Sequence, residues 1–210
     1  MLFRPHERIL FIGDSITDAD RGRDPAGLGL GYVRFIATYA AAMHPSLGLE
    51  FENRGVSGDT VRHLEARWER DVLAPHPHWV SISIGINDVW RQLDGGPGPV
   101  FIDEFQATLA RLVERTRAEN IRPLFMEPSI IEESPLSEGN RRLAPYVQAV
   151  RDLALRHGAP LVPVHEELIM FASAHPRPRL TVDGVHLSIT GTGRMAMSWL
   201  AATGLIPGTR

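Results

Sequence analysis

Short apolar runs alternate with longer amphipathic stretches along most of this chain. Runs with the length of buried β-strands lie at residues 9–12, 49–52, 79–84, 123–126 and 160–164. Stretches with apolar residues three or four positions apart, as in amphipathic helices, lie at residues 32–43, 60–73, 103–119, 143–157 and 189–202. Strands that alternate with helices favour a parallel sheet covered on both faces, so the pattern predicts an α/β protein.

The whole chain, residues 1–210, is expected to form one domain. Its length suits a single hydrophobic core, and its sequence shows neither an internal repeat nor a linker. The proline- and glycine-rich residues 97–99 and the segment 128–139 are predicted to be loops within that domain.

Polar clusters follow three of the predicted strands directly. Residues 13–15 follow the first strand, residues 53–55 the second and residues 85–88 the third. Ligands of open α/β sheets bind beyond the carboxyl ends of the strands, so these clusters are expected to meet at one edge. A fourth polar cluster, residues 183–186, precedes the last predicted helix.

The four clusters contain the residue types of a serine hydrolase. Ser15 could act as a nucleophile if a base accepts its proton, and that base must itself be oriented by a carboxylate. Among nine histidines, His186 has an acid three residues earlier, Asp183, with Gly184 between them to let the backbone turn. This spacing allows the carboxylate to reach one ring nitrogen while the other faces Ser15.

Acyl transfer also needs hydrogen-bond donors for the oxyanion that develops in the transition state. Gly55 offers a backbone N–H group with no side chain in the way, and Asn87 offers its side-chain amide. The backbone N–H of Ser15 is the third candidate donor.

Three further residues near these clusters, Asp14, Trp90 and Arg91, are considered next to the candidate catalytic residues. Asp14 is expected to brace the turn that presents Ser15 through hydrogen bonds to backbone N–H groups. Trp90 and Arg91 either line the substrate pocket, where Trp90 would stack on a sugar, or belong to the core and the surface respectively.

Composition excludes several other chemistries. The chain has no cysteine, and all 22 of its Lys and Arg residues are arginine, which excludes thiolate catalysis, Schiff-base chemistry and a lysine-containing phosphate loop. The net charge of −3 indicates neither nucleic-acid nor membrane binding. The N-terminal residues lack the layout of a secretory signal, so a cytoplasmic protein is expected. The oligomeric state, including a homo-oligomer, stays open.

The order of the four clusters resembles that of the SGNH hydrolases, also called the GDSL esterase/lipase family. The family's four named residues match Ser15 in GDSIT, Gly55 in NRGVSGDT, Asn87 in GINDVW and His186 in DGVH, and its triad aspartate falls on Asp183. The resemblance implies a flavodoxin-like three-layer α/β/α sandwich with a five-stranded parallel sheet. It also implies hydrolysis of esters or thioesters through a serine nucleophile, with neither a metal nor another cofactor.

A narrower resemblance is to the bacterial acetylxylan esterases of that family. It rests on LFIGDSITD, LGLGYV, VRHLEARWERDV and SIGINDVWRQ. The chain departs from that group at residues 180–182, which lack the expected tryptophan, and in the loop at residues 128–139. The sequence therefore predicts a serine esterase that removes short acyl groups, mainly acetyl, from carbohydrate esters such as acetylated xylo-oligosaccharides. A short-chain thioesterase or lysophospholipase is the alternative within the family.

Two alternatives belong to other classes of protein. A two-metal phosphoesterase could use the acidic residues near Ser15, but the sequence has no DxH motif upstream of Asp14. A sugar-binding module without activity would be expected to have lost Ser15, His186 or Asn87, and all three are present.

Overall fold

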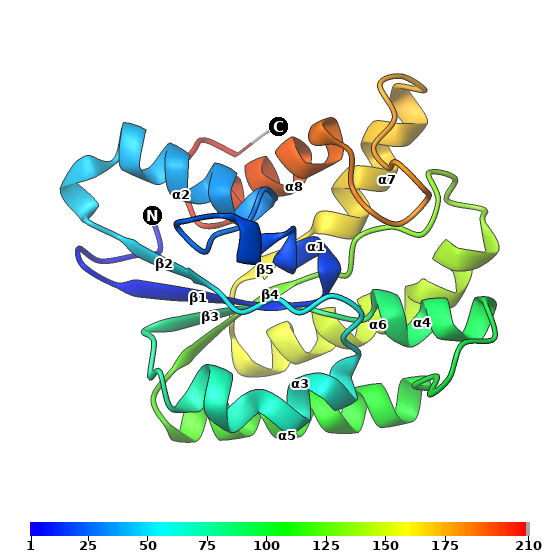
Figure 1. Cartoon of the computed structure of the whole chain (residues 1–210), viewed down its shortest axis with the longest axis horizontal. Coiled ribbons are helices and arrows are strands. Elements are labelled where there is room, and N and C mark those ends of the chain that lie inside the picture. Colours follow the sequence, from blue (N-terminus) through cyan, green and yellow to red (C-terminus); the bar gives the residue numbers. More distant parts are fainter. Residues whose placement is uncertain (209–210) are drawn as a thin grey trace.

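The computed structural model describes residues 1–208 and shows a five-stranded parallel sheet at the centre of the molecule (Figure 1). The strands are β1 (Arg8–Gly13), β2 (Glu50–Asn53), β3 (Trp79–Ser83), β4 (Arg122–Met126) and β5 (Leu161–Val162). Their order is β2-β1-β3-β4-β5, and every neighbouring pair is parallel. This is the flavodoxin-like order, as the resemblance to the SGNH hydrolases implies.

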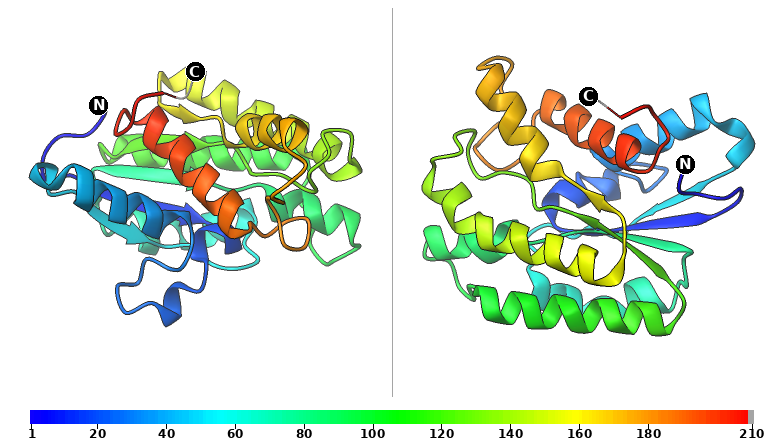
Figure 2. Two further views of the ribbon diagram at one scale, coloured as in Figure 1. Left: turned by 90° about the horizontal axis from the view of Figure 1, so that it is seen from above. Right: turned by 180° about the vertical axis from the view of Figure 1, so that it is seen from behind.

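Helices cover both faces of the sheet, so the fold has three layers (Figures 1 and 2). The helices are α1 (Ser15–Asp18), α2 (Tyr32–Met43), α3 (Val61–Trp68), α4 (Ile86–Leu93), α5 (Ile102–Ala118), α6 (Glu138–His157), α7 (Val164–Ala174) and α8 (Ile189–Ala202). One layer contains α2, α7 and α8, and the other contains α3, α5 and α6. No helix within residues 1–208 combines the length and the apolar character that a membrane span requires.

The helices α1, α4 and α7 were not predicted from the pattern. The first two are short and begin directly at the polar clusters after β1 and β3, where polar residues mask the apolar periodicity. The helix α6 also begins earlier than predicted, because Ser137 caps it by accepting a hydrogen bond from the Asn140 N–H. It therefore includes the last two residues of the predicted loop 128–139.

Buried side chains of α8 pack directly against the central strands of the sheet. Trp199 of α8 is fully buried and packs against Phe11 of β1, with the two rings tilted by 43° and their centroids 5.3 Å apart. Its indole N–H donates to the Ser81 hydroxyl of β3 at 3.1 Å, so the buried polar group is satisfied. This packing sets the position of α8 relative to β1, the strand that precedes Ser15.

The strand register brings the polar clusters to one edge. Gly13 at the end of β1 lies opposite Ser83 at the end of β3, and Phe11 lies opposite Asn53 at the end of β2. The loops that follow these strands therefore leave the sheet side by side, as expected for parallel strands.

Candidate active site

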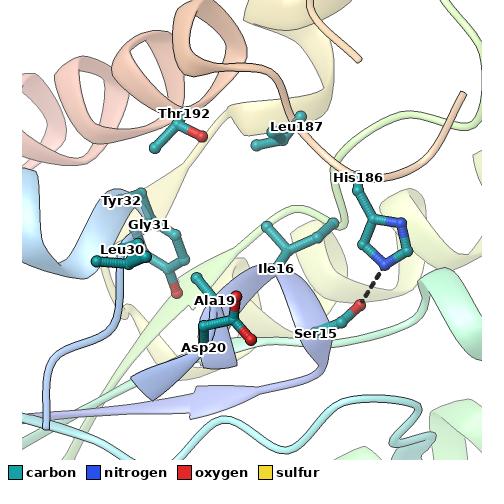
Figure 3. A pocket seen from close by; sticks show the side chains of 10 residues that line it. All are labelled: Ser15, Ile16, Ala19, Asp20, Leu30, Gly31, Tyr32, His186, Leu187 and Thr192. Carbon is teal, nitrogen blue, oxygen red and sulfur yellow. Dashed lines mark hydrogen bonds between the residues drawn. The ribbon is translucent and has the colours of Figure 1, made fainter. Parts of the chain in front are cut away.

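Ser15, His186 and Asp183 form a continuous hydrogen-bonded chain at this edge. The Ser15 Oγ lies 3.1 Å from His186 Nε2, and His186 Nδ1 lies 2.6 Å from Asp183 Oδ2. Figure 3 shows the His186 ring pointing at the serine hydroxyl from the loop before α8. The three residues that sequence reasoning selected thus lie in the arrangement that activates a serine hydroxyl.

The position of Ser15 follows from a sharp turn between β1 and α1. Asp14 is the N-cap of α1, and its Oδ1 accepts the Ile16 N–H at 3.0 Å. Gly13 is needed before it, because a Cβ at that position would clash with the Ser83 carbonyl oxygen. Ser15 is therefore the first residue of a helix that begins immediately after a central strand.

The position of Asp183 and His186 follows from a turn that the carboxylate itself stabilises. Asp183 Oδ1 accepts the N–H groups of Val185 at 3.0 Å and His186 at 2.8 Å, while Oδ2 accepts from the imidazole. Burial alone would raise the pKa of Asp183, but these hydrogen bonds and the nearby imidazole lower it to about 2. Asp183 is therefore ionised at neutral pH, and Gly184, with φ +95°, permits the tight turn.

Asp14 is buried behind Ser15, and its pKa is shifted upwards, whereas the pKa of Asp183 is shifted downwards. Its side chain is 2% exposed, and burial raises its pKa to about 7, with a further contribution from the negative charge of Asp59. Its contact with Ile16 agrees with the expectation that it braces the turn. Asp88 is similar, since burial is the main cause that raises its pKa to about 7.

Asn87 lies at the start of α4, beside the loop that follows β2. Its Nδ2 donates to the Asp59 carbonyl oxygen at 2.9 Å. An amide nitrogen carries two hydrogens, so the second remains for a substrate oxygen.

Gly55 does not match its expected role. Its N–H donates to the side-chain oxygen of Asn53 at 2.8 Å, and a single backbone hydrogen cannot serve an oxyanion at the same time. The glycine is required here for a different reason, because a Cβ would clash with the backbone of Thr17 and Asp18 in α1. The structure therefore does not support Gly55 as an oxyanion donor.

Gly58, three residues later in the same loop, is a candidate oxyanion donor that the sequence did not indicate. Its φ is +85°, and its carbonyl oxygen accepts from Arg91 Nη2 at 2.6 Å. Its N–H, like that of Ser15, has no hydrogen-bond partner among residues 1–208. The stretch NRGVSGDT contains two glycines, and the positive φ of the second was not visible in the sequence.

Arg67 of α3 contacts both the end of β1 and the loop that follows β2. Its guanidinium is 8% exposed and binds the carboxylates of Asp59 at 2.7 Å and Asp71 at 2.9 Å. It also donates to the carbonyl oxygens of Arg54 and Gly13. The end of β1 and the loop after β2 are therefore held by one buried cation.

Trp90 and Arg91 lie away from the cavity beside Ser15. Trp90 is partly buried and packs against the hydrophobic core, which favours the core interpretation. Arg91 contacts the loop of Gly58 and the carbonyl oxygen of Pro97, so it supports that loop.

A cavity of about 230 Å³ opens beside the serine (Figure 3). Ser15 and His186 form one end of it. The remaining lining residues come from the end of α1, the start of α2 and the start of α8: Ile16, Ala19, Asp20, Leu30, Gly31, Tyr32, Leu187 and Thr192. The space is next to the Ser15 hydroxyl, and both polar and apolar side chains line it.

Within residues 1–208, no group of three or more His, Cys, Asp and Glu side chains has an arrangement that could hold a metal ion. Three buried acidic residues of the site form hydrogen bonds with protein groups: Asp14 with the Ile16 N–H, Asp59 with Arg67 and Asp88 with the Val61 N–H.

Comparison with known proteins assigns this chain to a family. The sequence model of the GDSL-like lipase/acylhydrolase family matches residues 11–193, a range that includes every member of the hydrogen-bonded chain. The chain belongs to the GDSL-like lipase/acylhydrolase family and is a hydrolase of carboxylic esters.

Its relatives include characterised esterases. An acetylxylan esterase from Geobacillus stearothermophilus is 39% identical over 207 residues, which cover 94% of each chain. The crystal structure of Axe2, an acetylxylan esterase from the same organism, superposes with a TM-score of 0.92 at 36% identity, over 100% of this chain and 99% of that one. LAE5, an α/β hydrolase from the metagenome of Lake Arreo, superposes with a TM-score of 0.90 at 35% identity, over 97% of this chain and 98% of its own.

Proposed function

We propose that the protein is a serine esterase in which Ser15 attacks the ester carbonyl. The observation that carries this proposal is the hydrogen-bonded chain from Ser15 through His186 to Asp183. His186 Nε2 accepts the serine proton during the attack, and the ionised Asp183 stabilises the imidazolium that forms.

The oxyanion donors are the N–H groups of Ser15 and Gly58 and the Nδ2 of Asn87. The first lies at the N-terminus of α1, where backbone N–H groups have no partner within the helix. The other two lie next to each other, since Asn87 donates to the residue that follows Gly58. Donors fixed before the reaction stabilise the tetrahedral oxyanion without reorganisation.

Collapse of the tetrahedral intermediate releases the alcohol, which takes its proton from His186, and leaves an acyl group on Ser15 Oγ. Water then attacks the acyl-enzyme with His186 as the base again, and the carboxylic acid leaves as Ser15 regains its proton. No step requires a cofactor.

The substrates we propose are short-chain, mainly acetyl, esters of carbohydrates such as acetylated xylo-oligosaccharides. The relatives named as acetylxylan esterases support this choice over nearly the whole length of the chain. The cavity beside Ser15 is much larger than an acetyl methyl group, so it has room for a sugar on the alcohol side of the ester. We propose further that the enzyme works in the cytoplasm on small or oligomeric ester substrates, without nucleic acid or membrane.

A substrate panel and a covalent label together test this proposal. Wild-type protein should be labelled by a fluorophosphonate and should hydrolyse acetylated xylo-oligosaccharides and p-nitrophenyl acetate faster than p-nitrophenyl octanoate. Ser15→Ala should abolish both the labelling and the activity, and EDTA should leave the wild-type rate unchanged. A preference for octanoate would contradict the acetyl-ester assignment, and labelling that persists in Ser15→Ala would contradict the nucleophile.

A further inference from the structure

Asp183 and His186 lie at the tip of a small hairpin, residues 180–188, which we call the triad hairpin. Thr181 and Leu187 form an antiparallel bridge across it. The Val182 N–H donates to the His186 carbonyl oxygen at 2.9 Å, and the Ser188 N–H donates to that of Leu180 at 2.8 Å. Any displacement of the hairpin's base therefore moves both triad members relative to Ser15.

The base of the triad hairpin rests on one carboxylate from another part of the chain. Glu133 Oε1 accepts the N–H groups of Leu180 and Thr181, both at 3.0 Å, and the Thr181 hydroxyl at 2.9 Å. Arg179 Nε lies 3.5 Å from the same oxygen. The negative charge of the carboxylate strengthens these three hydrogen bonds, because hydrogen bonds to ionised groups are stronger than those to neutral ones.

The charge of Glu133 is consistent with this contact. Burial alone would raise the pKa of Glu133, but the hydrogen bonds from Thr181 and Leu180 and the charge of Arg179 lower it below its ordinary value. The carboxylate is therefore ionised at neutral pH.

The loop that carries Glu133 is itself anchored to α6. The side chain of Asn140 accepts the Ile131 N–H at 2.9 Å and donates to the carbonyl oxygens of Glu132 at 3.0 Å and Ser134 at 2.8 Å. The same loop meets the tip of the hairpin, where the Glu132 N–H donates to the Gly184 carbonyl oxygen at 2.6 Å. A rigid connection thus runs from α6 to both ends of the triad hairpin.

We propose that Glu133 is a positioning residue for catalysis, whose carboxylate clamps the base of the triad hairpin and so holds the Asp183–His186 pair in line with Ser15. The proposal rests on the proposed serine mechanism and adds a residue that touches neither substrate nor the reacting atoms. A misplacement of about 1 Å in a catalytic group can cost about 10²-fold in rate, so the clamp acts on kcat.

The test compares Glu133→Ala and Glu133→Gln with the matched control Glu132→Gln. The neighbouring Glu132 side chain is exposed and its carboxylate has no hydrogen-bond partner within residues 1–208, so its substitution removes the same charge without the clamp. With p-nitrophenyl acetate, Glu133→Ala should lower kcat by about 10²-fold with little change in KM. Glu133→Gln should recover part of that loss, because its amide oxygen can still accept hydrogen bonds. Glu132→Gln should match the wild type.

Thermal unfolding of each variant and fluorophosphonate labelling of Ser15 keep the outcomes separate. If Glu133→Ala does not fold, the kcat of Glu133→Gln decides. Wild-type kcat in the folded Glu133 variants, or an equal loss in Glu132→Gln, would overturn the clamp while Ser15-dependent labelling upheld the esterase. Activity and labelling that survive in Ser15→Ala would instead overturn the proposed function.

Discussion

A single polar group at this site can hold a loop by one hydrogen bond and still have a hydrogen left for the substrate. Asn87 illustrates this, since its Nδ2 uses one hydrogen to hold the Asp59 carbonyl oxygen and keeps the other for the oxyanion of the proposed mechanism. Gly55 shows the limit of such sharing, because its single N–H is already used by Asn53. The number of hydrogens on each nitrogen therefore decides which residues can stabilise the transition state.

We expect Asn87→Ala to lower kcat by about 10²–10³-fold while KM changes little, because it removes a donor that acts mainly in the transition state. Steady-state kinetics with p-nitrophenyl acetate measure this effect. Gln92→Ala is the control on the same helix, since that amide donates to the Val100 carbonyl oxygen and the Tyr146 hydroxyl and not to the loop that contains Gly58 and Asp59. Equal losses of kcat in both variants would show that α4 acts only as a scaffold.

At the scale of elements, the triad hairpin depends on how closely α8 packs beneath it. Gly191 in the first turn of α8 faces the Leu180 carbonyl oxygen, and a Cβ at that position would clash with it. Gly193, two residues later, has no atom of another segment within 4 Å of the place a Cβ would take. The two glycines therefore offer a matched pair on one helix.

We expect Gly191→Ala to reduce the free energy of unfolding by about 1–3 kcal/mol through overpacking. It should also lower kcat, because the base of the triad hairpin must shift. Gly193→Ala should raise the free energy of unfolding by up to about 1 kcal/mol, since alanine has the higher helix propensity. Urea denaturation and kinetics of both variants test this, and a wild-type kcat in a folded Gly191→Ala protein would contradict the coupling of α8 to the triad.

At the scale of the whole molecule, buried acids behind the site make stability depend on pH. The pKa values of Asp14 and Asp88 are raised by burial from 3.8 to about 7. Between these two values the folded protein binds more protons than the unfolded chain, so the free energy of unfolding falls as pH rises through this window. One oxygen of Asp88, Oδ2, is buried without a hydrogen-bond partner among residues 1–208. No hydrogen bond to this oxygen therefore stabilises the ionised form of Asp88.

We expect Asp88→Asn to become more stable relative to the wild type as pH rises from 5 to 8. Each unit of pKa shift is worth about 1.4 kcal/mol, so the relative gain should be on the order of 1–3 kcal/mol. Urea denaturation at both pH values measures the difference. Asp20→Asn, at an exposed carboxylate, serves as the control, and an equal pH dependence in both variants would contradict the role of burial.

The predictable part of the fold depended on local patterns. All five strands and the helices α2, α3, α5, α6 and α8 were expected near their observed positions, because burial of one face imposes a regular spacing on apolar residues. The short helices α1 and α4 were missed, since their first turns are made of site residues chosen for chemistry.

The sequence by itself determined the order of the elements, the edge of the sheet at which polar residues gather, and the pairing of Asp183 with His186. These features depend on spacing along the chain, which local geometry translates directly into structure. Only the tertiary structure decided that, within residues 1–208, the N–H of Gly58 rather than that of Gly55 lacks a partner, that Asp14 and Asp88 are buried, and that Glu133 accepts hydrogen bonds from the base of the triad hairpin. Each of these properties depends on contacts between segments far apart in the chain, where burial and the competition for hydrogen bonds are settled by packing.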